Sequence, residues 1–446
     1  MNSFIRSKPA QQLAMLKFKK MKNTVHAPVI NREKEINLHT THGCLRNLLI
    51  LGKISLVFPV EGIEGKDPGK IQFKFISLKT FLSVIFLIST STCFLLSIVK
   101  SLTSRNTMQR LISPLYYCHI ASVAFLNLHL SRKWKRYVTT IHAAELNFLK
   151  NYKPDKKLKR KIHATIAIVI LVGLCQYSIT EANFAISHDC LNEGAGFEQL
   201  IRKQYHYIYD YINYNVFNGV FLLILSFAST LAWNFGDLVI ITISIIYTSR
   251  FNQIVDKIKW YTSYKNRNAS IFSKEIEKLH DTFWRDSRRD YARMQLLCST
   301  TSDLFGILTL ITYSFNTMFI LIQLFVSLRP REYLIEILYF ISSFSFVVGR
   351  AVMSSIYGGW LYEAGRAALP IINAVPTEMY TEEASTFISQ IQMSSPYLTG
   401  RKFFTITKGI ILSIAASIIT FELGLIQFNQ SEIERYLSTS NVTICY

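Results

Sequence analysis

The stretch I-S-L-K-T-F-L-S-V-I-F-L-I-S-T-S-T-C-F-L-L-S-I-V, from Ile76 to Val99, carries a single charge, Lys79, near its start. A helix needs about 20 predominantly apolar residues to cross the hydrocarbon core of a bilayer. The stretch therefore predicts a membrane-spanning helix, and other runs along the chain reach the same length. The predicted spans are Ile76–Val99, Leu111–Leu130, Ile162–Ile186, Asn215–Ile246, Leu304–Leu328, Tyr333–Tyr357 and Phe403–Phe428.

The composition agrees with an all-α membrane protein of seven transmembrane helices. Of the 446 residues 50% are apolar and 17% are charged, below the roughly 25% charged residues of soluble domains. The charges cluster between the apolar runs. Before Ile76 the chain is polar and basic, without the short apolar core of a cleavable signal peptide.

Lysine and arginine in the connections predict the orientation of the chain. The N-terminal arm and the connections after spans two, four and six hold 38 of them, against 8 in the opposite set. Cytoplasmic loops are enriched in these residues, so the N-terminus is expected in the cytoplasm and the C-terminus outside. A net charge of +20 could indicate nucleic-acid binding, but its alternation with the spans favours attraction to the inner leaflet.

The spans divide the chain into segments with separate expected roles. Charged and apolar residues mix at helical spacing from Arg250 to Asp303, with one break near 266–270, which predicts cytoplasmic helical extensions that form an oligomerisation platform. Tyr380–Met393 predicts a short amphipathic anchor helix. The predicted segments are a cytoplasmic N-terminal arm (1–75), a ligand-binding bundle of spans one to four (76–249), the extensions (250–303), spans five and six (304–362), a cytoplasmic connection (363–402), a pore-lining span seven (403–428) and an extracellular tail (429–446).

The last predicted span carries small and polar residues along one helical face. They recur at steps of three and four: Gly409, Ser413, Ser417, Thr420, Gly424 and Gln427. Such a stripe either lets membrane helices pack closely or borders the water of an ion path between several copies of the helix. Gln427, a large amide at the outer end, favours the pore, and Phe428 suits an apolar constriction. Glu422 lies near the opposite face.

The end of this span also resembles the insect gustatory receptor family. Thr420-Phe421, five residues and Gln427-Phe428 are similar to the family's Thr-Tyr, five mostly apolar residues and Gln-Phe, with Phe in place of Tyr. F-P-V-E-G (Phe58–Gly62), S-L-K (Ser77–Lys79) and W-N-F-G-D-L (Trp233–Leu238) resemble the sugar-receptor branch. The resemblance implies a homotetramer-like, ligand-gated, non-selective cation channel in the plasma membrane of a sensory neuron. It also implies that the seventh helices line the pore.

Polar and aromatic residues in the outer halves of the spans are candidates for binding a sugar, which needs hydrogen-bond partners and aromatic faces. The candidates are Tyr116, His119, Glu181, Asn218, Trp233, Asn234, Asp237, Asn316 and Tyr339. Asp237 is either a ligand contact or one half of a structural ion pair with Arg350. Trp233 suits a core position as well as a ligand platform, and Glu181 is close enough to the outer interface to be simply solvated. His119 has no partner at metal-ligand spacing.

The sequence therefore predicts a gustatory receptor, a sugar-gated cation channel whose partners are a sugar, cations and lipid, possessing no catalytic, metal or cofactor site. Its lack of H-E-x-x-H, G-x-S-x-G and dinucleotide motifs argues against an enzyme. A secondary transporter for the sugar is the main alternative, although inverted repeats are missing. A seven-helix metabotropic receptor is disfavoured by the orientation. Sequons at Asn429 and Asn441 predict glycosylation of the outer tail. Cys445 in this tail could pair with Cys190, since the predicted orientation places both on the same side of the membrane.

Overall fold

The computed structural model describes residues 39–65, 68–103, 111–152, 154–189, 196–266, 274–327 and 334–439. Within these ranges the regular structure is helical, apart from two isolated β-bridges that join Glu61 to Gln72 and Thr399 to Thr405. The helices are α3 (Thr41–Ile54), α4 (Leu78–Leu102), α5 (Ile112–Asn151), α6 (Leu158–Asp189), α7 (Phe197–Gln204), α8 (His206–Tyr209), α9 (Val216–Asn266), α10 (Lys274–Ser327), α11 (Leu334–Arg366), α12 (Leu369–Asn373), α13 (Glu382–Met393) and α14 (Gly409–Thr439), with 3₁₀ turns at Pro68–Lys70 and Thr377–Met379.

Five of the described helices are long and apolar enough to cross a membrane. They are Leu78–Leu102, Leu158–Ile186, Val216–Ser263, His280–Val326 and Leu334–Asn373. The predicted spans one, three, four, five and six fall on these helices. Span two falls on α5, whose apolar run is interrupted by His119 and Asn127, and span seven falls on the shorter apolar helix Gly409–Gly424. The number seven therefore stays a prediction.

The predicted start of span seven was wrong. The helix begins at Gly409 instead of Phe403, and it continues to Thr439, beyond the predicted end at Phe428. A tight turn precedes it, in which Arg401 and Lys402 have φ values of 51° and 67°. The backbone N–H of Ile406 then bonds to the carbonyl of Leu398 at 2.8 Å. This bond and the one from the Gly400 N–H to the Phe404 carbonyl hold residues 398–406 in a loop, so the helix starts after it.

The predicted cytoplasmic extensions are helical. α9 and α10 continue far beyond their apolar segments and end or begin close to the predicted break, at Asn266 and Lys274. α13 matches the predicted anchor helix: the Thr381 side chain caps its N-terminus by accepting from the Ala384 N–H, and it ends at Met393. Such a cap satisfies one of the unpaired amides in the first turn of a helix.

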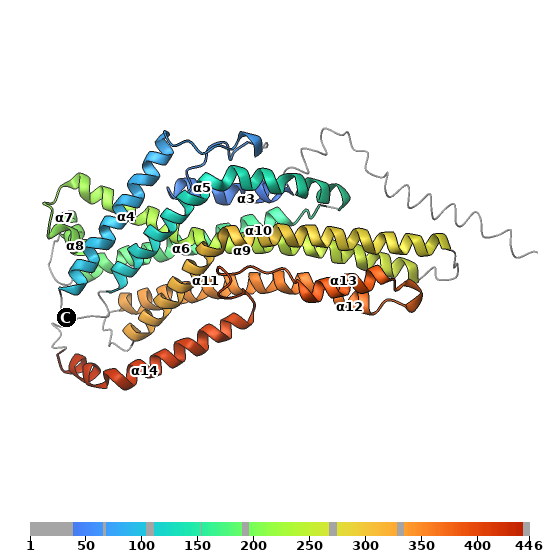
Figure 1. The fold of residues 1–446 in the computed structure, drawn as a ribbon. Coiled ribbons are helices and arrows are strands. Elements are labelled where there is room, and N and C mark those ends of the chain that lie inside the picture. Colours follow the sequence, from blue (N-terminus) through green and yellow to red (C-terminus); the bar gives the residue numbers. More distant parts are fainter. Residues whose placement is uncertain are drawn as a thin grey trace, which may run out of the picture.

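The helices form one elongated bundle with a continuous apolar core (Figure 1). α9 is central, since it contacts α3, α5, α6, α10 and α11. α7 and α8 cover one end of the bundle, and the extensions of α9 and α10 form the other end. α14 lies along one edge of the bundle. It diverges from the other helices toward the end that α7 and α8 cover.

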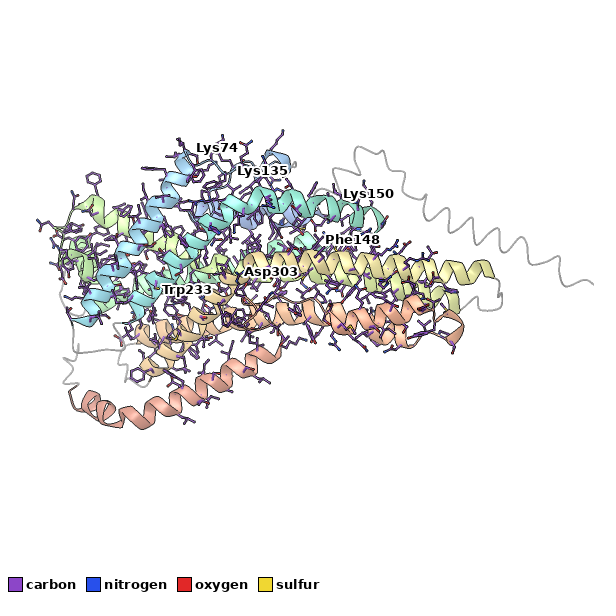
Figure 2. All side chains as sticks on the ribbon, in the orientation of Figure 1. Lys74, Lys135, Phe148, Lys150, Trp233 and Asp303 are labelled. Carbon is purple, nitrogen blue, oxygen red and sulfur yellow. The ribbon has the colours of Figure 1, made fainter. Side chains whose placement is uncertain are left out.

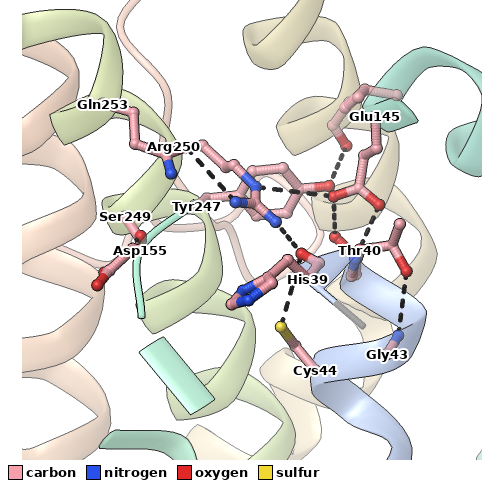
Figure 3. Close-up of polar contacts among 12 residues, drawn as sticks. His39, Thr40, Gly43, Cys44, Glu145, Asp155, Tyr247, Ser249, Arg250 and Gln253 are labelled. Carbon is pink, nitrogen blue, oxygen red and sulfur yellow. Dashed lines mark hydrogen bonds and ion pairs between the residues drawn. The ribbon is translucent and has the colours of Figure 1, made fainter. Parts of the chain in front are cut away.

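A buried polar cluster docks α3 against the extensions (Figure 3). The Glu145 carboxylate accepts from the Thr41 backbone N–H at 2.8 Å and from its hydroxyl at 2.5 Å. The Arg250 guanidinium donates to the His39 carbonyl and lies 4.0 Å from Glu145. Burial raises the pKa of Glu145, which Arg250 and Thr41 oppose. The carboxylate therefore joins α3 to α5, and Arg250 joins the same segment to α9.

Candidate functional site

The bundle encloses a cavity of about 590 Å³ at the end covered by α7 and α8. This volume lies within the roughly 300–1,000 Å³ of small-molecule sites. α5, α6, α9, α10 and α11 form most of the walls, and α7 and α8 contribute Gln204 and Tyr207. The lining side chains include Tyr116, Tyr117, Gln176, Glu181, Asn183, Gln204, Tyr207, Trp233, Asn234, Phe319, Gln323, Glu336, Tyr339, Ser343, Phe346, Val347 and Arg350.

The cavity lies in the half of the molecule that the charge pattern predicts to be extracellular. Trp233 marks this half in Figure 2, whereas Lys135 and Lys150 mark the part of α5 toward the opposite end. Both lysines are exposed. If the basic end faces the cytoplasm, the cavity is on the side from which a soluble ligand arrives.

Aromatic rings form one side of the cavity. Trp233 lies 5.2 Å from Tyr116 and 4.6 Å from Phe319 between ring centroids. Tyr117 receives a hydrogen bond from the Tyr207 hydroxyl at 2.9 Å, which ties α5 to α8. Rings held by such contacts offer rigid apolar faces to a ligand.

Arg350 on α11 lies at the deep end of the cavity and binds a set of groups behind it. Its Nη1 lies 3.3 Å from the Asp237 carboxylate and donates to the Asn234 side-chain oxygen at 3.1 Å. The guanidinium also stacks against Trp233 and Phe346, at 4.8 and 4.9 Å from the ring centroids. Asp237 is fully buried and does not line the cavity. Of the two roles considered for Asp237, the geometry supports the ion pair.

The similarity of the chain to known proteins agrees with this architecture. A family model described as "Trehalose receptor" matches residues 21–436. The chain belongs to the trehalose-receptor family.

Curated relatives place the receptor in the sugar branch of the insect gustatory receptors. It is 26% identical over 396 residues to the Drosophila melanogaster gustatory receptor for sugar taste 64f, covering 87% of this chain and 81% of the relative. Identity to gustatory receptor 5a for trehalose from the same fly is 21% over 401 residues, covering 88% and 86%. With its apolar helices, the receptor is a multi-pass protein of the plasma membrane.

The receptor also has the fold of a solved insect olfactory receptor. The structure of OR5 from Machilis hrabei superposes with a TM-score of 0.61 at 10% identity, covering 86% of this chain and 98% of that one. The complex of OR5 with eugenol gives a TM-score of 0.59 with the same coverage. At this identity the likeness concerns the fold alone.

The predicted binding residues of the receptor fall into two groups. Tyr116, Glu181, Trp233, Asn234 and Tyr339 line the cavity.

The other four predicted residues, His119, Asn218, Asp237 and Asn316, do not line it. His119 is buried behind Trp233, where its ring stacks on Phe315 at 4.8 Å. Asn218 is exposed near the start of α9. Asn316 donates to Asp237 at 3.0 Å and accepts from Arg350 at 3.4 Å, so it belongs to the layer beneath the cavity.

Sequence reasoning missed three glutamine side chains and one carboxylate of the cavity wall. These residues are Gln176, Gln204, Gln323 and Glu336. Gln176 precedes Thr180 and Glu181 by about one helical turn, a spacing that would have placed it on their face. Gln204 gave no such signal, because it lies in the short helix α7, outside every predicted span.

The small polar side chains of the stripe on α14 form hydrogen bonds with the backbone of their own helix. The hydroxyls of Ser413, Ser417 and Thr420 donate to backbone carbonyls four residues earlier, at 3.3, 2.9 and 2.9 Å. All three residues are exposed, and a Cβ at Gly424 would meet no atom within 4 Å. The side chains of Gln427, Phe428 and Asn429 lie outside the described part, as do Asn441, Cys190 and Cys445.

The residues that the structure describes contain no group of three or more His, Cys, Asp or Glu side chains able to hold a metal ion.

Proposed function

We propose that this receptor is a sugar-gated, non-selective cation channel, with a ligand cavity in each subunit and a central pore lined by α14. The main support is the cavity, which places the rings of Tyr116, Trp233 and Phe319 beside amide, hydroxyl and carboxylate groups. A sugar has apolar C–H faces and a polar rim, so it can use both kinds of wall. The sugar-taste and trehalose receptors among the relatives support the same ligand class.

The position of α14 supports its proposed role in the pore. Along Gly409–Gly424, where the structure describes the side chains of α14, one side of the helix packs on its own subunit: Ile418 is buried and Ile414 half-buried against α10 and α11. The Ser413, Ser417 and Thr420 side stays exposed. Small, self-satisfied hydroxyls tolerate water without demanding a fixed partner, which suits a pore of low selectivity. The proposed assembly is a homotetramer in which four copies of α14 surround the pore and the extensions form a platform.

The cavity adjoins the apolar cluster on which α14 rests. Phe319 on α10 and Val347 on α11 line the cavity, and both also belong to the apolar cluster that holds Ile418. A ligand that shifts either side chain changes the surface on which α14 rests. A ligand can open the channel only if it binds the open state more tightly than the closed state. The shared cluster is where a change in the cavity could alter the packing of α14 and so distinguish the two states.

Whole-cell recording tests the proposal in cells that express this chain alone. A panel of mono- and disaccharides should evoke a cation current, and Gln427→Ala should change its permeability or rectification. Sugar uptake without current would contradict the channel and indicate the transporter.

Cysteine accessibility tests the pore face. During sugar application an impermeant charged thiol reagent should block the current of Ser417→Cys and spare that of Ile418→Cys, whose position is buried, with the unsubstituted chain as background. Equal block of both variants would contradict the proposed orientation of α14.

A further inference from the structure

Four amide side chains of the cavity wall share an unusual hydrogen-bonding state. Gln176, Asn183, Gln204 and Gln323 all line the cavity. The side-chain oxygen of each is buried and accepts no hydrogen bond from any residue that the structure describes. Buried polar groups are normally satisfied, so four unmet acceptors around one cavity call for a physical reason.

The nitrogen atoms of three of these amides are engaged by the protein itself. Gln176 Nε2 donates to the Thr180 hydroxyl at 3.4 Å. Gln204 Nε2 donates to the Glu181 carboxylate at 3.3 and 3.4 Å. Gln323 Nε2 donates to the Ser343 hydroxyl at 2.7 Å. An amide nitrogen carries two hydrogens and its oxygen accepts up to two bonds. In these three residues the nitrogen has a partner in the protein and the oxygen has none.

The deeper donors of the cavity are also occupied. Asn234 Nδ2 donates to the Thr230 carbonyl at 2.9 Å, and the Trp233 indole N–H donates to the Asn316 oxygen at 3.5 Å. The terminal nitrogens of Arg350 serve Asn234, Asn316 and Asp237. These deep donors therefore already have partners in the protein, unlike the four amide oxygens.

Two carboxylates add further acceptors. Glu181 on α6 and Glu336 on α11 line the same cavity. An ionised carboxylate accepts hydrogen bonds and donates none. We call Gln176, Glu181, Asn183, Gln204, Gln323 and Glu336 the acceptor wall. It draws on α6, α7, α10 and α11, so it faces a ligand from several sides.

We propose that the cavity recognises its ligand through the hydroxyl hydrogens that the ligand donates, and that it selects polyols by their O–H groups instead of their oxygen acceptors. The inference rests on the proposed function, because it concerns the same cavity. A hydroxyl can donate to the wall, whereas a fluorine or methoxy group of similar position cannot. The terminal torsion of an amide is broad, so each buried oxygen can turn toward the lumen when a donor arrives.

A series of sugar analogues tests the inference on the unmodified receptor. The strongest sugar agonist is compared with its monodeoxy, monodeoxyfluoro and mono-O-methyl derivatives by dose–response of the current. At one or more ring positions fluorine should raise the half-maximal concentration roughly ten- to a hundredfold, as much as deletion of the hydroxyl. If fluorine preserved potency at every position where deletion reduced it, the hydroxyls would act as acceptors and the inference would fail.

A matched pair of variants assigns the effect to the wall. Gln323→Met keeps the length of the side chain but removes its acceptor. It should raise the half-maximal concentration of the parent sugar and reduce the further rise that fluorine causes at one ring position. Gln392→Met on the exposed face of α13 should leave both unchanged. Surface labelling confirms that each variant reaches the membrane.

The two proposals fail in different ways. If no sugar evokes a current in surface-expressed protein, the proposed function is overturned and this inference with it. If sugars do evoke currents but their fluoro derivatives keep the potency that the deoxy derivatives lose, the proposed function stands and only the proposal that the ligand is recognised through its hydroxyl hydrogens is overturned.

Discussion

At the scale of single residues, Asp237 and Arg350 show how charge is kept inside an apolar bundle. Arg350 contacts groups on α9 and α10 from its place on α11, and Asp237 also accepts from Ser354 at 3.3 Å. Charges within membrane helices are costly unless they are paired or hydrated. The pair therefore joins three helices directly beneath the ligand cavity.

Removing one partner of this pair should cost more than removing both. Asp237→Leu leaves the Arg350 charge buried without its counterion, which destabilises a protein by about 3–5 kcal/mol, whereas an apolar replacement of both partners is often nearly neutral. We expect the double variant Asp237→Leu, Arg350→Met to melt at a higher temperature in detergent than Asp237→Leu. Additive losses in the double variant would show that the two side chains do not interact.

At the scale of elements, glycines let the loop before α14 pack closely on α11. A Cβ at Gly365 would collide with the Pro396 ring, and one at Gly359 would lie 2.6 Å from the Lys408 side chain. Lys408 also pairs with Glu363 of α11 at 2.7 Å. The start of the proposed pore helix is thus held against α11 by contacts that tolerate no added methyl group.

Gly365→Ala should displace this loop. The Pro396 ring is tied to the backbone and cannot rotate away, so overpacking of about 1–3 kcal/mol is expected. Gly349→Ala is the matched control on the same helix, because its Cβ would meet nothing within 4 Å. Thermal unfolding of the two variants checks the difference, and a Gly365→Ala protein as stable as Gly349→Ala would refute the close approach.

The docking of α3 should be sensitive to acid. His42 is buried on α3, and burial, with smaller effects of His142 and Arg46, lowers its pKa to about 4. When α3 leaves the bundle, the side chain regains its ordinary pKa of about 6.5 and binds a proton more readily. Docking therefore loses stability as the pH falls from 6.5 toward 4, by about 2 kcal/mol at pH 5.

Hydrogen exchange of Thr41–Ile54, corrected for intrinsic rates, measures this loss. Exchange should accelerate between pH 7 and pH 5 in the parent protein, while His42→Phe should show a much flatter dependence. The same acid dependence in both proteins would exclude His42 as the cause.

At the scale of the whole molecule, the exposed side of α14 requires a cover. Leu412, Ile419 and Leu423 are exposed together with the polar stripe, and their fractional exposures are 74%, 60% and 57%. Lipid can cover the apolar residues. The proposed tetramer places the polar stripe against water in the pore.

Counting subunits checks this arrangement. Single receptors that carry an N-terminal fluorescent protein should bleach in up to four steps at the cell surface. If receptors at the cell surface bleached in one step while a full sugar-evoked current persisted, a central pore shared by four subunits would be contradicted.

The helices, their approximate limits and the family could be predicted from the sequence because their signals are local. A membrane-length apolar run is required wherever a helix crosses a bilayer, and Thr381 and Ser394 stand directly before and after the 12 residues of α13. The start of α14 escaped prediction. The start of α14 depends on the preceding loop, which forms backbone hydrogen bonds within itself and packs against Gly365. Apolar periodicity along the chain does not predict such a loop.

The sequence by itself determined a multi-pass helical membrane protein whose spans carry polar and aromatic residues. Only the tertiary structure decided which polar residues meet there. It brought Gln204 beside Glu181, paired Asp237 with Arg350 behind the cavity, and left the amide oxygens of the wall unmatched. Hydropathy and helical spacing depend on neighbours along the chain, whereas hydrogen-bond satisfaction depends on how separate helices cross.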